Sequence, residues 1–297
     1  MDNKLAIIIV NWKQYELTSK CLSSIYKSKF KNFEVLLIDN ESNFKKLKNL
    51  SDNFKKLKVF KNEYNRGFGA ANNQGINYAI QNNFKYVMLL NNDTEVDENF
   101  IDPLINTTNK DNLIGAVQPL IMNYNNKNSV WSAGGYINKF FGYTSTIKNP
   151  NRNLRLDWVT GCCILLKVDI IKKVGLIDEN FFAYYEDVDW SFRIKDLGFS
   201  LNLVNTSLVY HHGSKSSKNS SFEGNLSPKV HYLNFKNHIY LLRKHINKFN
   251  FLGLILYQSI KLFFYSVYFI LRLRFNKLRI IYQGIIDGLK LEIKWLY

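Results

Sequence analysis

Residues 87–100, VMLLNNDTEVDENF, join a run of four apolar residues directly to Asn91, Asn92 and Asp93. A continuous apolar run is typical of a strand that is buried on both faces, as in a parallel sheet. Polar groups at the end of such a strand would be costly to bury without partners. The stretch therefore predicts either a helix cap or a ligand site, and the rest of the chain must decide between them.

The same alternation continues through the first 120 residues. Apolar runs typical of buried strands lie at 5–10, 33–39, 57–60, 86–90 and 113–119. Patterns typical of helices lie between them, at 15–27, 42–50, 69–82 and 97–108. This order predicts an α/β fold with a mostly parallel central sheet and right-handed crossovers. Residues 122–156 are rich in Asn, Ser, Gly and Tyr and predict a loop-rich insertion, and 156–175 predict a strand and a short helix.

Polar residues follow each of the first four predicted strands. They are Asn11, then Asp39 and Asn40, then the segment containing Asn65 and Gly67, and then 91–93. In a parallel sheet these carboxyl ends share one edge, outside which ligands bind. A single polar strand end is more often a cap or a turn, but four together favour a ligand site. The glycines of 67–75 are weak evidence for a dinucleotide loop, because Asn72 stands where the third glycine would be.

A second acidic cluster, Glu186, Asp187 and Asp189, precedes an amphipathic segment. Acids in this place can simply complement a helix dipole. Alternatively, packed carboxylates raise the pKa of one member and supply a general base. His211 and His212 end another apolar run, and one imidazole with Asp93 could hold Mg²⁺ or Mn²⁺. The spacing alone does not show which.

Charge is concentrated in the C-terminal part of the chain. The 297 residues carry a net charge of +16, and from residue 229 onward there are 12 Lys and Arg against 2 Asp and Glu, or +10. These basic residues alternate with long aliphatic runs and no nucleic-acid motif occurs, so an anionic membrane surface is favoured over nucleic acid. Three cysteines without metal-ligand spacing predict reduced thiols in a cytosolic protein.

Residues 229–247 predict an aromatic-rich amphipathic helix, and 251–275 a long apolar one interrupted by Gln258, Ser259 and Lys261. The polar interruptions disfavour a membrane span. A helix lying in the membrane interface is favoured, with a packed core helix and a true span as alternatives. We expect a catalytic region at 1–228, divided near residue 120, and a helical region at 229–297.

The ordered motifs IIIVNWKQ, LLIDNES, NRGFGAANNQGI, LLNNDTEV, DWVTGCCILLK, DENFFAYYEDVDWSFR and VYHHG resemble those of family-2 inverting glycosyltransferases with the GT-A fold. Within that family the chain is most similar to rhamnosyltransferase-type enzymes of bacterial surface polysaccharide synthesis. The resemblance spans roughly residues 4–215, and it extends to C-terminal helices that seat such enzymes on membranes.

The resemblance implies roles for individual residues. Asn11 and Asp39 would contact the nucleobase, and the nucleotide-sugar would also meet Asn40, Asn65, Gly67, Asn92 and Asp93. Asp93 and His211 would hold the metal, with His212 as a rival. Asp187 would be the base and Glu186 its neighbour, and the acceptor side would include Trp158, Gly161, Asp189 and Trp190. One departure is Asn91, which replaces the first acid of the DxD motif.

The expected activity is inverting transfer of a sugar from a nucleoside-diphosphate sugar to a hydroxyl of a saccharide or lipid-linked saccharide. The resemblance favours dTDP-L-rhamnose, with UDP-hexose or UDP-galactofuranose as alternatives and Mg²⁺ or Mn²⁺ as cofactor. A non-catalytic scaffold and a basic nucleic-acid-binding protein are remote alternatives. The expected location is peripheral, on the cytoplasmic face of a bacterial inner membrane, and the sequence does not indicate an oligomeric state.

Overall fold

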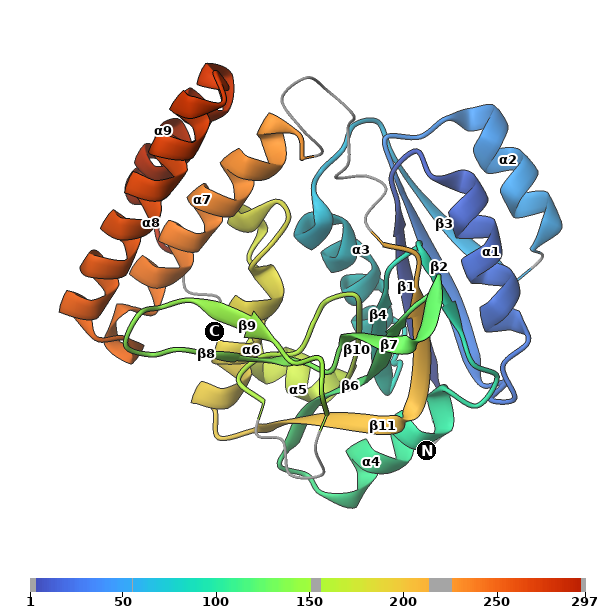
Figure 1. Cartoon of the computed structure of the whole chain (residues 1–297). Helices are drawn as coiled ribbons and strands as arrows, with labels where there is room; N and C mark the ends of the chain where they lie inside the picture. Colours follow the sequence, from blue (N-terminus) through green and yellow to red (C-terminus); the bar gives the residue numbers. More distant parts are fainter. Residues whose placement is uncertain (1–3, 55, 151–155, 214–225, 295–297) are drawn as a thin grey trace.

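The computed structural model describes residues 4–54, 56–150, 156–213 and 226–294, and a nine-stranded mixed sheet forms its centre (Figure 1). The sheet order is β3-β2-β1-β4-β10-β6-β11-β5, and β7 pairs with β6. Its strands are β1 (Leu5–Asn11), β2 (Phe33–Asn40), β3 (Leu57–Asn62), β4 (Tyr86–Leu90), β5 (Thr94–Val96), β6 (Ile114–Asn123), β7 (Asn126–Ser132), β10 (Cys163–Lys167) and β11 (Ser200–His211). A separate two-stranded ribbon contains β8 (Gly135–Ile137) and β9 (Thr144–Thr146).

Helices cover both faces of the sheet. Leu5, Ile7 and Ile9 of β1 pack in the same core as α1, α2 and α4, whereas Ala6 and Ile8 pack with α3, α5 and α6. Side chains of a strand alternate between the two faces, so a strand covered on both sides must be apolar throughout. The helices are α1 (Tyr15–Tyr26), α2 (Phe44–Asn53), α3 (Phe68–Gln81), α4 (Ile101–Lys110), α5 (Val168–Val174) and α6 (Glu186–Asp196), with a 3₁₀ turn at Glu179–Phe181.

The predicted α/β architecture is confirmed. Strands β1 to β4 are parallel to one another, but β10 runs antiparallel to both β4 and β6, so the sheet is mixed. Two predictions about local structure were wrong. The region 122–156, expected to be a loop, contains β7, β8 and β9, and the helix expected from residue 97 begins at Ile101, after a turn in which the Asp97 carboxylate accepts from the Asn99 N–H. Strands of three residues are too short to show a hydrophobic period.

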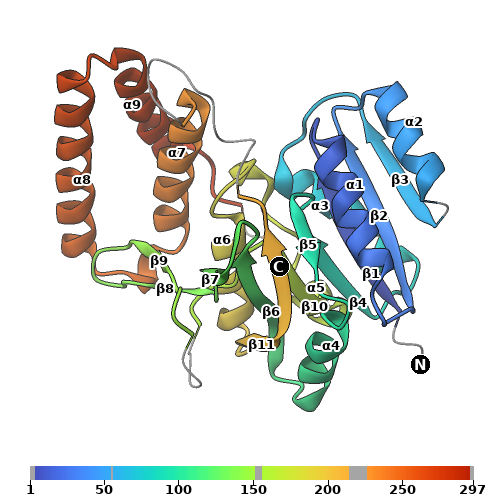
Figure 2. The same ribbon diagram turned by 45° about the vertical axis from the view of Figure 1, so that its right-hand side comes forward.

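Three further helices form the C-terminal part: α7 (Pro228–Lys244), α8 (Phe251–Leu271) and α9 (Phe275–Lys290), with a 3₁₀ turn at Ile246–Lys248. Figure 2 shows α7 between α8 and the part of the fold that contains α6. Helix α9, which lies within the helical region expected at 229–297 but was not delimited there, packs closely on α7. A Cβ atom at Gly284 would lie 2.8 Å from the carbonyl oxygen of Tyr232, so glycine permits this close approach.

Candidate active site

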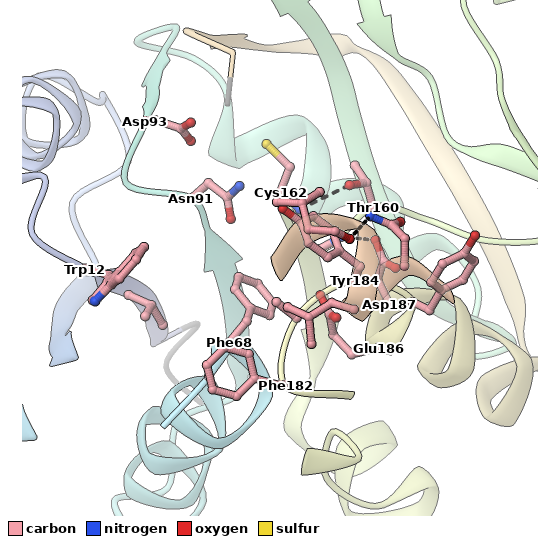
Figure 3. A pocket seen from close by; sticks show the side chains of 18 of the residues that line it. Trp12, Phe68, Asn91, Asp93, Thr160, Cys162, Phe182, Tyr184, Glu186 and Asp187 are labelled. Carbon is pink, nitrogen blue, oxygen red and sulfur yellow. Dashed lines mark hydrogen bonds between the residues drawn. The ribbon is translucent and has the colours of Figure 1, made fainter. Parts of the chain in front are cut away.

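A cavity of about 780 Å³ opens at the carboxyl ends of the parallel strands, and Figure 3 shows it from close by. Asp93 and Trp12 lie on one side of it and the acid pair on the other. Ten of the fourteen site residues expected from the sequence line it: Asn40, Asn65, Gly67, Asn92, Asp93, Trp158, Gly161, Glu186, Asp187 and His211. Asn11, Asp39, Asp189 and Trp190 do not.

Asn11 and Asp39 lie behind the cavity wall, and both are fully buried. The Asn11 amide donates to one carboxylate oxygen of Asp39 at 2.5 Å, and the Tyr15 hydroxyl donates to the other at 2.9 Å. Both carboxylate oxygens thus accept hydrogen bonds within the protein, and the expected contact with a nucleobase stays a prediction. The pair fixes the turn after β1, which presents the half-exposed indole of Trp12 to the cavity.

Asn40 organises the loop that follows β3. Its side-chain oxygen accepts from the Arg66 backbone N–H at 3.0 Å, and its amide donates to the Asn65 side chain at 2.9 Å. The loop ends at Gly67, whose φ is +87°. A Cβ there would also lie 2.6 Å from the carbonyl oxygen of Phe182. Both the backbone conformation and the close approach require glycine.

The end of β4 brings Asp93 to His211 on β11. Their side chains are almost fully buried, with 3.3 Å between the Asp93 carboxylate and His211 Nε2. His212 lies outside the cavity, with Nε2 2.9 Å from a Glu95 carboxylate oxygen. The structure thus places His211 at the cavity and His212 beside Glu95.

Asp93, His211 and the nearby Asn91 side chain fit a divalent cation in part. An oxygen and an imidazole nitrogen are suitable ligands for Mn²⁺ or Mg²⁺, which usually keep waters and substrate phosphates as further ligands. However, His211 Nδ1 accepts from the Gly213 N–H at 3.1 Å, which places the neutral ring's proton on Nε2. That proton would have to move before Nε2 could bind a metal. Among the described residues, no group of three His, Cys, Asp or Glu side chains could hold a metal by itself.

Glu186 and Asp187 begin α6 and face the cavity. The Asp187 carboxylate accepts from the Gly161 N–H at 3.0 Å and from its neighbour Val188 at 2.9 Å. Burial raises the pKa of Asp187, and these hydrogen bonds oppose the rise. Burial, and then the charge of Asp187, raise the pKa of Glu186 to about 8. One Glu186 oxygen has no hydrogen-bond partner among the described residues, and with a pKa of about 8 Glu186 holds a proton at neutral pH.

Asp189 and Trp190 were expected on the acceptor side, but neither lines the cavity. Two residues along a helix correspond to a rotation of about 200°, which turns Asp189 away from the direction of Asp187. Its carboxylate lies 2.9 Å from Arg193, Lys244 and His245. Burial opposes ionisation there, but the His245 hydrogen bond and the charges of Arg193 and Lys244 hold the pKa of Asp189 below its ordinary range. The Trp190 indole donates to the Gly175 carbonyl at 3.0 Å.

The sequence analysis missed several cavity residues. Trp12 directly follows Asn11, and an aromatic residue beside a polar strand end was a usable signal. Lys229 is the single lysine or arginine among the described residues that line the cavity, and it lies 4.7 Å from the centre of the Phe182 ring. No local pattern marks it, because α7 reaches the cavity only through the tertiary fold. Acceptor choice was also assigned to 122–156 and 213–228, of which 151–155 and 214–225 lie outside the described residues.

The sequence model of the family described as Glycosyl transferase family 2 matches residues 6–175 of this chain, more than half of its length. The chain belongs to this family. The matched region contains the strand ends on the Asp93 side of the cavity, and it ends before the acid pair and α7.

This family 2 chain is similar to two curated relatives. Over 199 residues it is 25% identical to the low-salt glycan biosynthesis hexosyltransferase Agl10 of Haloferax volcanii, a match that covers 66% of the chain and 62% of Agl10. Over 260 residues it is 22% identical to the dTDP-rhamnosyl transferase RfbF of Shigella flexneri, covering 82% of the chain and 81% of RfbF. The chain therefore spans less than two thirds of the length of Agl10.

Its fold is similar to that in a crystal structure of GalNAc-T7 with UDP, GalNAc and Mn²⁺. The TM-score is 0.63 at 19% identity, and the superposition covers 81% of this chain and 47% of GalNAc-T7. At this identity the likeness concerns the fold alone. The family 2 chain thus has a GT-A-like fold, with a mixed, mostly parallel sheet flanked by helices, and C-terminal helices follow it.

Proposed function

We propose that this chain is an inverting glycosyltransferase, which moves a sugar from a nucleoside-diphosphate sugar to a hydroxyl of a saccharide or lipid-linked saccharide. One observation carries the proposal. A single cavity holds polar strand ends suited to a nucleotide and its phosphates, and the half-buried Asp187 carboxylate, which the Gly161 N–H holds in place beside Glu186. A general base must be able to reach the proton that it removes, and Asp187 faces the same cavity.

The reaction follows from these groups. Asp187 accepts the proton of the acceptor hydroxyl while the acceptor oxygen bonds to the anomeric carbon of the donor. The bond between that carbon and the phosphate oxygen breaks on the opposite side, so the configuration inverts and the nucleoside diphosphate leaves. Lys229 supplies positive charge from α7. When bound at Asp93 and His211, a divalent cation would offset the charge that develops on the diphosphate.

For the donor we propose dTDP-L-rhamnose, supported by the similarity to RfbF along most of both chains. The test offers dTDP-L-rhamnose, UDP-glucose and UDP-galactofuranose to the purified protein with Mn²⁺ or Mg²⁺ and a lipid-linked saccharide acceptor. Release of the nucleoside diphosphate and the anomeric configuration of the product are measured. Inverted rhamnoside supports the whole proposal, and transfer from a UDP-sugar alone would replace the donor. A product with retained configuration would contradict the mechanism.

We also propose that α8 lies in an anionic membrane surface, on the cytoplasmic side of a bacterial inner membrane. Among the described residues it is the one helix long and apolar enough to cross a membrane, and 11% of its apolar stretch is buried. Its outward side chains include Phe251, Leu252, Leu256, Phe263, Phe264 and Leu271. Lys261 instead points at α7, where its ammonium lies 3.3 Å from His238 Nδ1. The charged residue of the interruption thus faces protein, and although Ser259 is exposed, the outward face is predominantly apolar and suited to lipid.

The experiment compares the full chain with a chain ending at Lys248 in flotation with phosphatidylglycerol and phosphatidylcholine vesicles. The full chain should float with the anionic vesicles, and high salt or alkaline carbonate should release part of it. The shortened chain should stay in the soluble fraction. Equal flotation of both chains would contradict the proposal, and resistance of the full chain to carbonate would indicate a membrane span.

A further inference from the structure

The loop that leads into the acid pair has an unusual backbone. Phe182, Tyr184 and Tyr185 have φ values of +60°, +73° and +72°. For residues other than glycine this region costs on the order of 1–2 kcal/mol each, and it persists only where the surroundings impose it. Tyr185 is the N-cap of α6 and directly precedes Glu186, so whatever holds this loop also sets where the two acids point.

Asn237 of α7 holds the loop. Its side-chain amide donates to the carbonyl oxygens of Phe181, Ala183 and Tyr184, at 2.6, 2.7 and 2.9 Å. Asn237 is fully buried, and its own carbonyl oxygen has no partner among the described residues. An unpaired buried acceptor costs about 1–3 kcal/mol. The three loop carbonyls thus have a donor, whereas the carbonyl oxygen of Asn237 is left without one.

Other residues on the same side of α7 hold the two ends of the loop. The His238 ring stacks on Tyr185 with centroids 5.1 Å apart, and the Tyr240 ring meets Phe181 edge-on at 5.1 Å. One turn further along, the Lys244 ammonium lies 2.7 Å from Asp178 and 2.9 Å from Asp189. These acids lie before and after the loop, so α7 fixes both of its flanks.

The opposite side of the loop contacts Gly67 and Phe68, at the start of α3. The Phe182 carbonyl accepts from the Phe68 N–H at 2.5 Å, at the start of α3. The same carbonyl occupies the space that a side chain at Gly67 would need. The loop 181–185 is therefore held between α7 and the loop at 65–67. Its conformation sets the position of the acid pair relative to the proposed donor site.

From these contacts we infer that Asn237 is a positioning residue for the acid pair, and that α7 contributes to the active site by holding the loop that precedes the pair. The inference rests on the proposed function. Without the amide, three carbonyls lose their donor and the left-handed residues can relax, which moves Asp187 relative to the cavity. A misplacement of about 1 Å can cost on the order of 10²-fold in rate. We expect nucleotide binding to stay intact, because the polar ends of β1 to β4 and Lys229 do not depend on the Asn237 amide.

The experiment compares Asn237→Ala with Tyr232→Phe, which removes one hydrogen bond of α7 to Asp287 on α9 and leaves the loop untouched. Transfer is expressed per nucleotide-binding site, counted by titration with dTDP or UDP. We expect Asn237→Ala to lower kcat by about 10- to 100-fold, with the nucleotide Kd within about twofold, and Tyr232→Phe to match the wild type. Unchanged kcat per binding site in Asn237→Ala would overturn the inference. If that variant fails to fold, Asn237→Ser, which keeps one hydroxyl donor, takes its place.

Hydrogen exchange of the amides of 181–188 provides a readout that needs no activity. Exchange should be faster in Asn237→Ala than in Tyr232→Phe, and equal exchange in the two variants would overturn the clamp. If the wild type transfers no sugar, the proposed function fails, but this comparison still decides whether Asn237 holds the loop. Failure of the inference and failure of the proposed function are thus distinguished.

Discussion

Replacing Glu186 by Gln should change how the stability of the protein depends on pH. Burial, followed by the charge of Asp187, raises the pKa of Glu186 from the ordinary 4.5 to about 8. The folded protein then binds a proton that the unfolded chain has already lost, so the resulting stabilisation is complete below pH 4.5 and disappears as the pH rises through 8. Each pH unit in this window is worth about 1.4 kcal/mol. The whole effect is on the order of 5 kcal/mol.

Glutamine keeps the shape and the neutral state of the protonated acid at every pH. We therefore expect the stability of Glu186→Gln relative to the wild type to increase as the pH rises. The free energy of unfolding of both proteins is measured by urea denaturation between about pH 5 and pH 9. Glu63→Gln, which removes an exposed carboxylate, controls for the loss of one charge. If wild type and Glu186→Gln gave parallel stability profiles over this range, Glu186 would be ionised in the fold and the assignment of the proton would be wrong.

Three further outcomes are expected. Asp187→Asn should keep nucleotide affinity but lose transfer by at least about 10²-fold, because an amide cannot accept the proton, and turnover within tenfold of the wild type would move the base elsewhere. Lys229→Ala should raise the Kd for UDP or dTDP about fivefold at low salt and less at high salt. Lys110→Ala, at the end of α4, should leave the Kd unchanged, and equal effects of the two substitutions would contradict a contact between Lys229 and the nucleotide. Lys244→Met should lower the free energy of unfolding by about 3 kcal/mol or more, since it leaves two buried carboxylates short of a partner; the exposed Lys248–Asp196 pair is the control, and Lys248→Met should cost less than about 1 kcal/mol. A loss in Lys244→Met no larger than in Lys248→Met would refute that account.

The sequence predicted the elements whose signal is local. The apolar runs of β1, β2 and β4 alternate with helical patterns over many residues, so their order and parallel pairing followed directly. The polar end of β4 placed Asn92 and Asp93 at the correct edge of the sheet. Strands β7 to β9 were missed because two of them have three residues each and β7 is largely polar.

The direction of a side chain at the end of an element was harder to predict. Asp39 lies at the carboxyl end of β2 as expected, but its carboxylate accepts from the hydroxyl of Tyr15, 24 residues earlier in the chain. Asp189 lies two residues after Asp187, and only the start of α6 decides which of the two faces the cavity. Asn237 and Lys229 reach the site from α7, more than 40 residues after the acid pair, and no pattern in the sequence specifies that contact.

The central claim is that the segments at the carboxyl ends of β1 to β4 form a nucleoside-diphosphate site. Calorimetric titration of the purified full chain with dTDP, UDP, GDP and NAD, each with and without Mn²⁺, tests this claim most directly. The account predicts that at least one nucleoside diphosphate binds one site per chain, more tightly with Mn²⁺, and that NAD does not compete with it. If none of the three nucleoside diphosphates bound, with or without the metal, the glycosyltransferase proposal would be contradicted.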